Sequence, residues 1–79
     1  METNFEFVRG QLEGAGFDFT FICKNEEKGY FDGKLRNGIW GVIQILNEHE
    51  SEIRLNAYGH LVVKIPNTKV FAFIHQMSK

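Results

Sequence analysis

The amino-acid sequence predicts an α+β domain, mainly β, in which a short N-terminal helix precedes a strongly curled antiparallel sheet or small barrel of about five to six strands. Two observations support this fold class: apolar residues alternate with period two in several segments, and an Asn37-Gly38 pair separates two strand-like runs. At 79 residues, the chain (residues 1–79) is long enough for a single domain with one core. Closing the sheet would hide its edge strands.

The segment 3–13 fits either a helix or a first strand. Phe5, Val8 and Leu12 fall at helical spacing, which predicts an amphipathic helix. Phe5 and Phe7 also alternate as they would in a strand. We favour the helix and keep a first β-strand as the alternative.

Alternating patterns predict the strands that follow. Residues 17–23 place four apolar side chains on one strand face: Phe17, Phe19, Phe21 and Cys23. The segments 52–58 and 60–65 alternate in the same way, with Gly59 as a bend between them.

The tail 69–77 is ambiguous. Val70, Ala72 and Ile74 alternate with aromatic residues, whereas Val70, Ile74 and Met77 also suit a helix. We expect a strand here, with the helix as the alternative.

The hairpin around Asn37-Gly38 is the most informative stretch. A two-residue type I′ turn would set Leu35 opposite Trp40 and Gly33 opposite Val42. One face of this hairpin, expected in the core, then carries Phe31, Leu35, Trp40, Val42 and Leu46. The other face mixes charge with isoleucines and is the predicted partner-binding surface: Tyr30, Lys34, Arg36, Ile39, Ile43 and Ile45.

Charge and cysteine content narrow the class of protein. The chain has nine Lys and Arg and ten Asp and Glu, so it lacks the basic excess that is usual in proteins that bind duplex nucleic acid. The single cysteine cannot form an intrachain disulfide or a cysteine zinc site and suits a reducing compartment. The first four residues lack a basic region, and no long apolar run follows. We therefore expect a cytoplasmic protein without a membrane segment.

Groups that could carry chemistry are sparse. Ser51 and Ser78 lie outside any nucleophile motif, and the three histidines show no metal-ligand spacing. Cys23 ends an aromatic strand face, which favours a buried structural thiol. The sequence thus predicts a protein that is not an enzyme and has no catalytic residue, metal or cofactor.

The leading functional hypothesis is docking to another protein, as an inhibitor or adaptor, or self-association into a homo-oligomer. Apolar groups ringed by charge, as on the isoleucine face, are typical of interfaces. The alternative for that face is coverage by the chain's own N-terminal segment or tail, which would make it core.

A second functional hypothesis is single-stranded nucleic-acid binding by a small β-barrel. The order of a helix, Phe31-x-Gly33-x-Leu35, an apolar strand at 42–46 and a break near Tyr58-Gly59-His60 resembles the Sm-like barrel layout. The chain departs from that family by having Asn37-Gly38-Ile39 where a Phe-Asp element is expected. The resemblance implies a barrel and RNA binding but transfers no functional residue.

Overall fold

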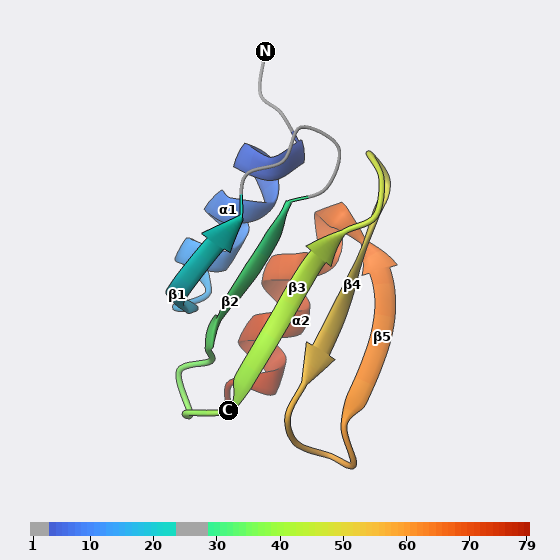
Figure 1. Ribbon diagram of the computed structural model, residues 1–79. Helices are drawn as coiled ribbons and strands as arrows, with labels where there is room; N and C mark the ends of the chain where they lie inside the picture. Colours follow the sequence, from blue (N-terminus) through green and yellow to red (C-terminus); the bar gives the residue numbers. More distant parts are fainter. Residues whose placement is uncertain (1–3, 24–28) are drawn as a thin grey trace.

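The computed structural model describes the backbone of residues 4–23 and 29–79, and the side chains of 4–18 and 29–79. Figure 1 shows a meander of strands with both helices behind it. In chain order the elements are α1 (Asn4–Gly14), β1 (Asp18–Cys23), β2 (Tyr30–Lys34), β3 (Trp40–Ile45), β4 (Glu50–Leu55), β5 (Leu61–Pro66), the 3-10 turn η1 (Asn67–Lys69) and α2 (Val70–Met77).

The sheet is open. Its five strands pair in chain order, each antiparallel to its neighbour, and β1 and β5 form the two edges (Figure 1). The prediction of a strongly curled sheet or small barrel is therefore wrong, and the Sm-like layout loses its basis. Because two helices cover one face, this sheet buries its apolar side chains without closing on itself.

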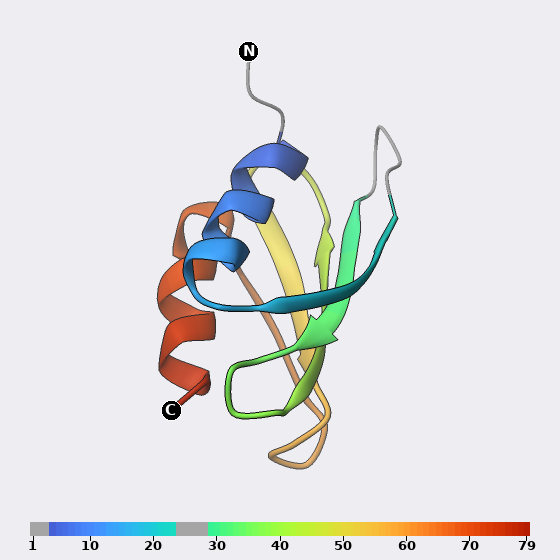
Figure 2. The same ribbon diagram turned by 90° about the vertical axis from the view of Figure 1, so that its left-hand side faces the viewer.

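Both helices lie against the same face of the sheet, as Figure 2 shows. The helix predicted at the N-terminus is confirmed: Val8 and Leu12 of α1 are fully buried. The strand predicted over 69–77 is wrong, since Lys69 ends η1 and Val70–Met77 form α2. Val70 and Ile74, four residues apart, are both fully buried, so the helical spacing is the one that the core uses.

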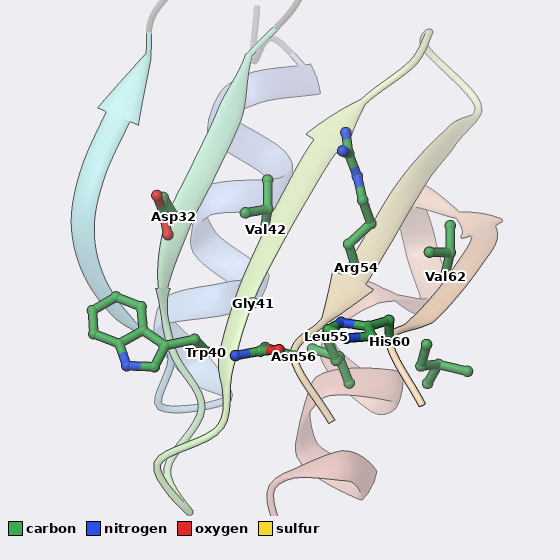
Figure 3. A pocket seen from close by; sticks show the side chains of 10 residues that line it. Asp32, Trp40, Gly41, Val42, Arg54, Leu55, Asn56, His60 and Val62 are labelled. Carbon is green, nitrogen blue, oxygen red and sulfur yellow. The ribbon is translucent and has the colours of Figure 1, made fainter. Parts of the chain in front are cut away.

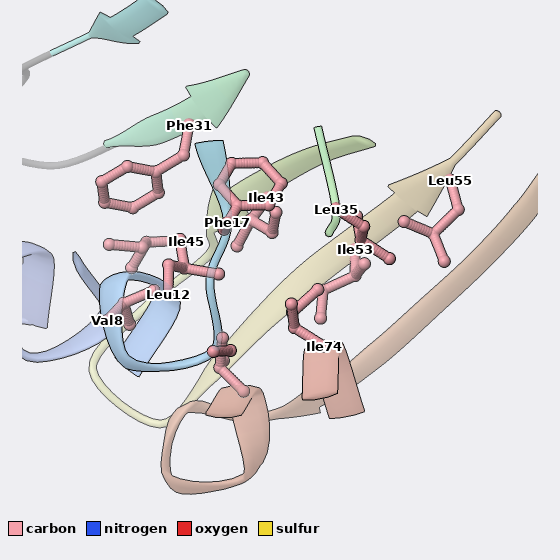
Figure 4. Packing of buried hydrophobic residues seen from close by; sticks show 12 residues of the cluster. Val8, Leu12, Phe17, Phe31, Leu35, Ile43, Ile45, Ile53, Leu55 and Ile74 are labelled. Carbon is pink, nitrogen blue, oxygen red and sulfur yellow. The ribbon is translucent and has the colours of Figure 1, made fainter. Parts of the chain in front are cut away.

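The core lies between the sheet and the helices (Figure 4). It is formed by apolar side chains from every layer: Val8, Leu12, Ala15, Phe17, Phe31, Leu35, Ile43, Ile45, Ile53, Leu55, Val70 and Ile74. The predicted core aromatics Phe19 and Phe21, and the thiol of Cys23, have side chains outside the described residues.

The predicted hairpin is present, but its register differs by one residue. The N–H of Gly38 donates to the carbonyl of Leu35 at 2.9 Å, and the N–H of Leu35 donates to the carbonyl of Ile39 at 2.8 Å. These bonds enclose a three-residue loop in which only Gly38 has a positive φ, of 94°. This geometry is a type I turn closed by a glycine bulge, not a type I′ turn.

The shift reverses the two faces of β3. Lys34 pairs with Trp40, and Phe31 pairs with Ile43. Because side chains alternate along a strand, a slip of one residue moves each of them to the other face. Phe31 and Leu35 are buried as predicted, but Trp40 and Val42 lie on the opposite face from the core.

Gly33 marks a close approach between β1 and β2. The pairing of these strands is irregular between Phe19 and Phe21, directly opposite Gly33. A Cβ at Gly33 would collide with the carbonyl oxygen of Asp18 and touch the ring of Phe17 at 3.0 Å. A glycine beside a β-bulge is a common way to let two backbones meet.

A cluster of polar residues joins the helical layer to the sheet, with Ser51 and Asn67 buried and Gln11 half-buried. The Ser51 hydroxyl donates to Oδ1 of Asn67 at 2.6 Å, and Nδ2 of Asn67 donates to the carbonyl of Asn47 at 3.1 Å. Oε1 of Gln11 accepts from the N–H of Phe71 at 3.0 Å. Partnered buried polar groups fix one geometry, so this cluster sets how α1 and α2 sit on the sheet.

Candidate binding face

The six residues predicted to bind a partner do not share one surface. Ile43 is fully buried and Ile45 is 4% exposed, both in the core. Ile39 is half-buried and packs against that core. The expected isoleucine face is therefore the inner face of the sheet, beneath the helices.

The three polar members separate as well. Tyr30 and Lys34 are half-buried and alternate with the buried Phe31 and Gly33 along β2, so they face away from the helices. Arg36 lies in the hairpin loop, where its guanidinium approaches Gly16 in the turn after α1. The structure thus keeps two of the six on the outer face, defined here as the side of the sheet without helices.

Within the described residues, no helix covers the outer face of the sheet (Figure 2). Two of its side chains are large, apolar and exposed: Trp40 at 44% and Val62 at 55%. Sequence reasoning missed Trp40 because the wrong register assigned it to the core, and it did not single out Val62. A three-residue loop at Asn37-Gly38, had it been considered, would have placed Trp40 outside.

A shallow hollow of about 240 Å³ crosses this face from β2 to β5 (Figure 3). Its floor and walls come from Asp32, Trp40, Gly41, Val42, Arg54, Leu55, Asn56, His60, Leu61 and Val62. We call this the Trp40 hollow. In Figure 3 the indole of Trp40 stands at one end, and His60 and Val62 stand at the other.

Two cations near the hollow are held by neighbouring side chains. Arg54 makes an ion pair with Glu52, with Nε 2.9 Å from Oε2, and its Nη2 donates to Oε1 of Gln44 at 2.9 Å. Nζ of Lys34 lies 5.7 Å from the centre of the Trp40 ring, at cation–π distance. The apolar part of the Trp40 hollow thus lies beside oriented charges of both signs: Lys34 and Arg54 are cationic, and Glu52 is anionic.

The turn between β4 and β5 extends this surface. Three consecutive residues have positive φ: Tyr58 (54°), Gly59 (71°) and His60 (62°). The left-handed region is unfavourable for the two that are not glycine. The turn is anchored by the N–H of Leu61, which donates to the carbonyl of Ala57 at 3.1 Å. It presents Tyr58, 59% exposed, and brings His60 to the rim of the hollow.

Comparison of the chain with protein-family models, with curated proteins and with solved structures found no significant match. Within the described residues, no helix has the length and apolar character needed to cross a membrane. In the same part of the chain, no three His, Cys, Asp or Glu side chains gather as metal ligands would.

Proposed function

We propose that this domain binds another protein through the outer face of its sheet, with the Trp40 hollow receiving one apolar side chain of the partner. The observation that carries the proposal is the exposed pair Trp40 and Val62 on a face that neither helix covers. The two side chains stand at opposite ends of the Trp40 hollow, and exposed apolar surface rimmed by polar groups is characteristic of interaction sites.

The residue types on this face support a protein partner. Trp, Tyr and Arg are the residues that most often dominate binding energy at protein interfaces. The face offers Trp40 and Arg54, and Tyr58 is exposed in the adjacent turn between β4 and β5. Arg54 is already oriented by Glu52 and Gln44, so little side-chain entropy is lost when a partner docks.

The size of the hollow supports a single side chain as its occupant. Pockets for small molecules usually measure roughly 300–1,000 Å³ and enclose most of the ligand. The Trp40 hollow, at about 240 Å³, is smaller and open to one side. In this proposal the protein acts without catalysis, as an inhibitor or adaptor, and the cytoplasmic location remains a prediction.

A capture experiment tests the proposal. The wild-type chain, Trp40→Ser and Phe7→Ser are each used to bind proteins from a lysate of the source organism, followed by quantitative mass spectrometry. Phe7 is the matched control because it is 38% exposed but belongs to α1 on the other side of the molecule. We expect one partner to be retained by wild type and Phe7→Ser and lost with Trp40→Ser.

The interaction is then measured with the purified partner. Trp40→Ser should weaken binding by about 2 kcal/mol or more, as expected for a hot-spot residue. Equal retention by all three chains would contradict the proposal. So would salt-sensitive quenching of Trp40 fluorescence by a mixed-sequence single-stranded RNA, because that result would assign the face to nucleic acid.

A further inference from the structure

The free edge of β5 is the second unpartnered feature of the molecule. In the described part of the chain, β5 pairs with β4 on one side and with no strand on the other. Its sequence, Leu61-Val62-Val63-Lys64-Ile65-Pro66, is apolar apart from one lysine, and three of its six residues are β-branched. An edge of this kind exposes backbone donors and acceptors that can pair with another strand.

The register shows which backbone groups face that edge. The N–H of Leu61 donates to Ala57, and the N–H of Asn67 donates to His49, both toward β4. In an antiparallel ladder the direction alternates along the strand, so the odd-numbered residues of β5 point to β4. The N–H and C=O groups of Val62 and Lys64 therefore point outward. Pro66 lies in the same outward series, where its missing N–H removes no ladder bond.

The inner face of the sheet is also incompletely covered along this edge. Ser51, Ile53 and Leu55 of β4 are between 0% and 2% exposed. Their cross-strand partners on β5 are only half-buried: Ile65, Val63 and Leu61. An apolar strip thus continues from the core to the free edge, where it is only partly covered.

We infer that β5 pairs antiparallel with β5 of a second copy of this chain, about a two-fold axis at Val63. In this register Val62 of each copy lies opposite Lys64 of the other, and the two exchange their outward N–H and C=O groups. On the inner face Val63 meets Val63, and Leu61 meets Ile65, which continues the apolar strip across the axis. This inference goes beyond the proposed function because it uses the edge of the sheet and not its outer face.

The neighbouring registers are less favourable. A register centred on Lys64 sets this residue directly opposite Lys64 of the second copy, and like charges in that position are destabilising. It also sets Val62 opposite Pro66, which has no N–H to give. A register centred on Val62 sets Lys64 opposite His60 of the second copy and leaves Ile65 without an apolar partner. Only the register centred on Val63 satisfies the outward groups and the apolar strip together, so the edge is complementary to itself.

Pairing of this kind would join the two sheets into one. The two-fold axis runs perpendicular to the sheet, so both outer faces lie on the same side. The dimer would then present two Trp40 hollows on one side. Val62 forms part of the wall of each hollow and also belongs to the strand that pairs.

Sedimentation velocity over a range of concentrations tests the inference with two variants at one position. Val62 is 55% exposed, so a charged side chain is tolerated there in the monomer. Val62→Lys places the new lysine opposite Lys64 twice per dimer and should weaken dimerisation by roughly tenfold. Val62→Glu places a carboxylate opposite Lys64 and should leave the dimer as tight as wild type or tighter. The double variant Val62→Lys/Lys64→Glu should restore it.

Circular dichroism and thermal unfolding confirm that each variant is folded. Trp40→Ser should dimerise like wild type, which separates this inference from the proposed function. Hydrogen exchange of the wild-type chain gives an independent reading: the amides of Val62 and Lys64 should gain protection as concentration rises, while that of Val63 is protected throughout. A wild-type chain that stays monomeric, or a dimer weakened equally by Val62→Lys and Val62→Glu, would overturn the inference.

Discussion

The two faces of the sheet are made by alternate residues of the same strands, yet one face is buried beneath the helices and the other is exposed. On β3, Ile43 is fully buried beneath the helices, whereas Trp40 is 44% exposed on the bare side. Composition does not separate these faces, since large apolar residues occur on both. What separates them is the register of one hairpin, which decides which apolar set becomes core and which remains available for binding.

The largest expected effect comes from placing an aspartate at two neighbouring positions of β3, one on each face of the sheet. Ile43→Asp puts a carboxylate into the core and should cost more than about 4 kcal/mol of unfolding free energy, enough to unfold a small domain. Val42→Asp, one residue earlier and on the outer face, should cost about 1 kcal/mol through lower β propensity. Urea unfolding of the two variants measures the difference, and similar losses would break the distinction between the faces.

A smaller effect tests how closely the inner face is packed. Gly33→Ala adds a Cβ that meets the Asp18 carbonyl and the Phe17 ring, and should cost roughly 1–3 kcal/mol. Gly10→Ala is the matched control, because a Cβ at that position in α1 would meet no atom of another part of the molecule within 4 Å. It should stabilise the domain by up to about 1 kcal/mol. Thermal unfolding should therefore shift in opposite directions, and a neutral Gly33→Ala would show that β1 can move away.

Much of the element order is present in the sequence, because period-two alternation and helical spacing are local signals. They predicted α1 and the alternating strands. The hairpin register was not accessible, since Asn37-Gly38 fits both a two-residue I′ turn and a three-residue loop in which Gly38 alone has positive φ. The candidate face was missed for the same reason.

The C-terminal segment shows a second reason why secondary structure could not be predicted from the sequence alone. Residues 69–77 satisfy both periods, and the choice depends on packing that is distant in sequence. Gln11 of α1 accepts a hydrogen bond from the first turn of α2, and Phe71 lies 3.4 Å from the position of a Cβ on Gly14. A helix at this place covers the core beside α1, which removes the need for a closed barrel.

The most direct test of the account is the solvent accessibility of Trp40, the only tryptophan in the chain. Acrylamide quenching of its fluorescence is measured in the folded protein and in the urea-unfolded chain. We expect ready quenching in the folded state, because the indole is 44% exposed at one end of an open hollow. Strong shielding in the folded protein would contradict it, since Trp40 would then belong to the core and the outer face would lose its binding site.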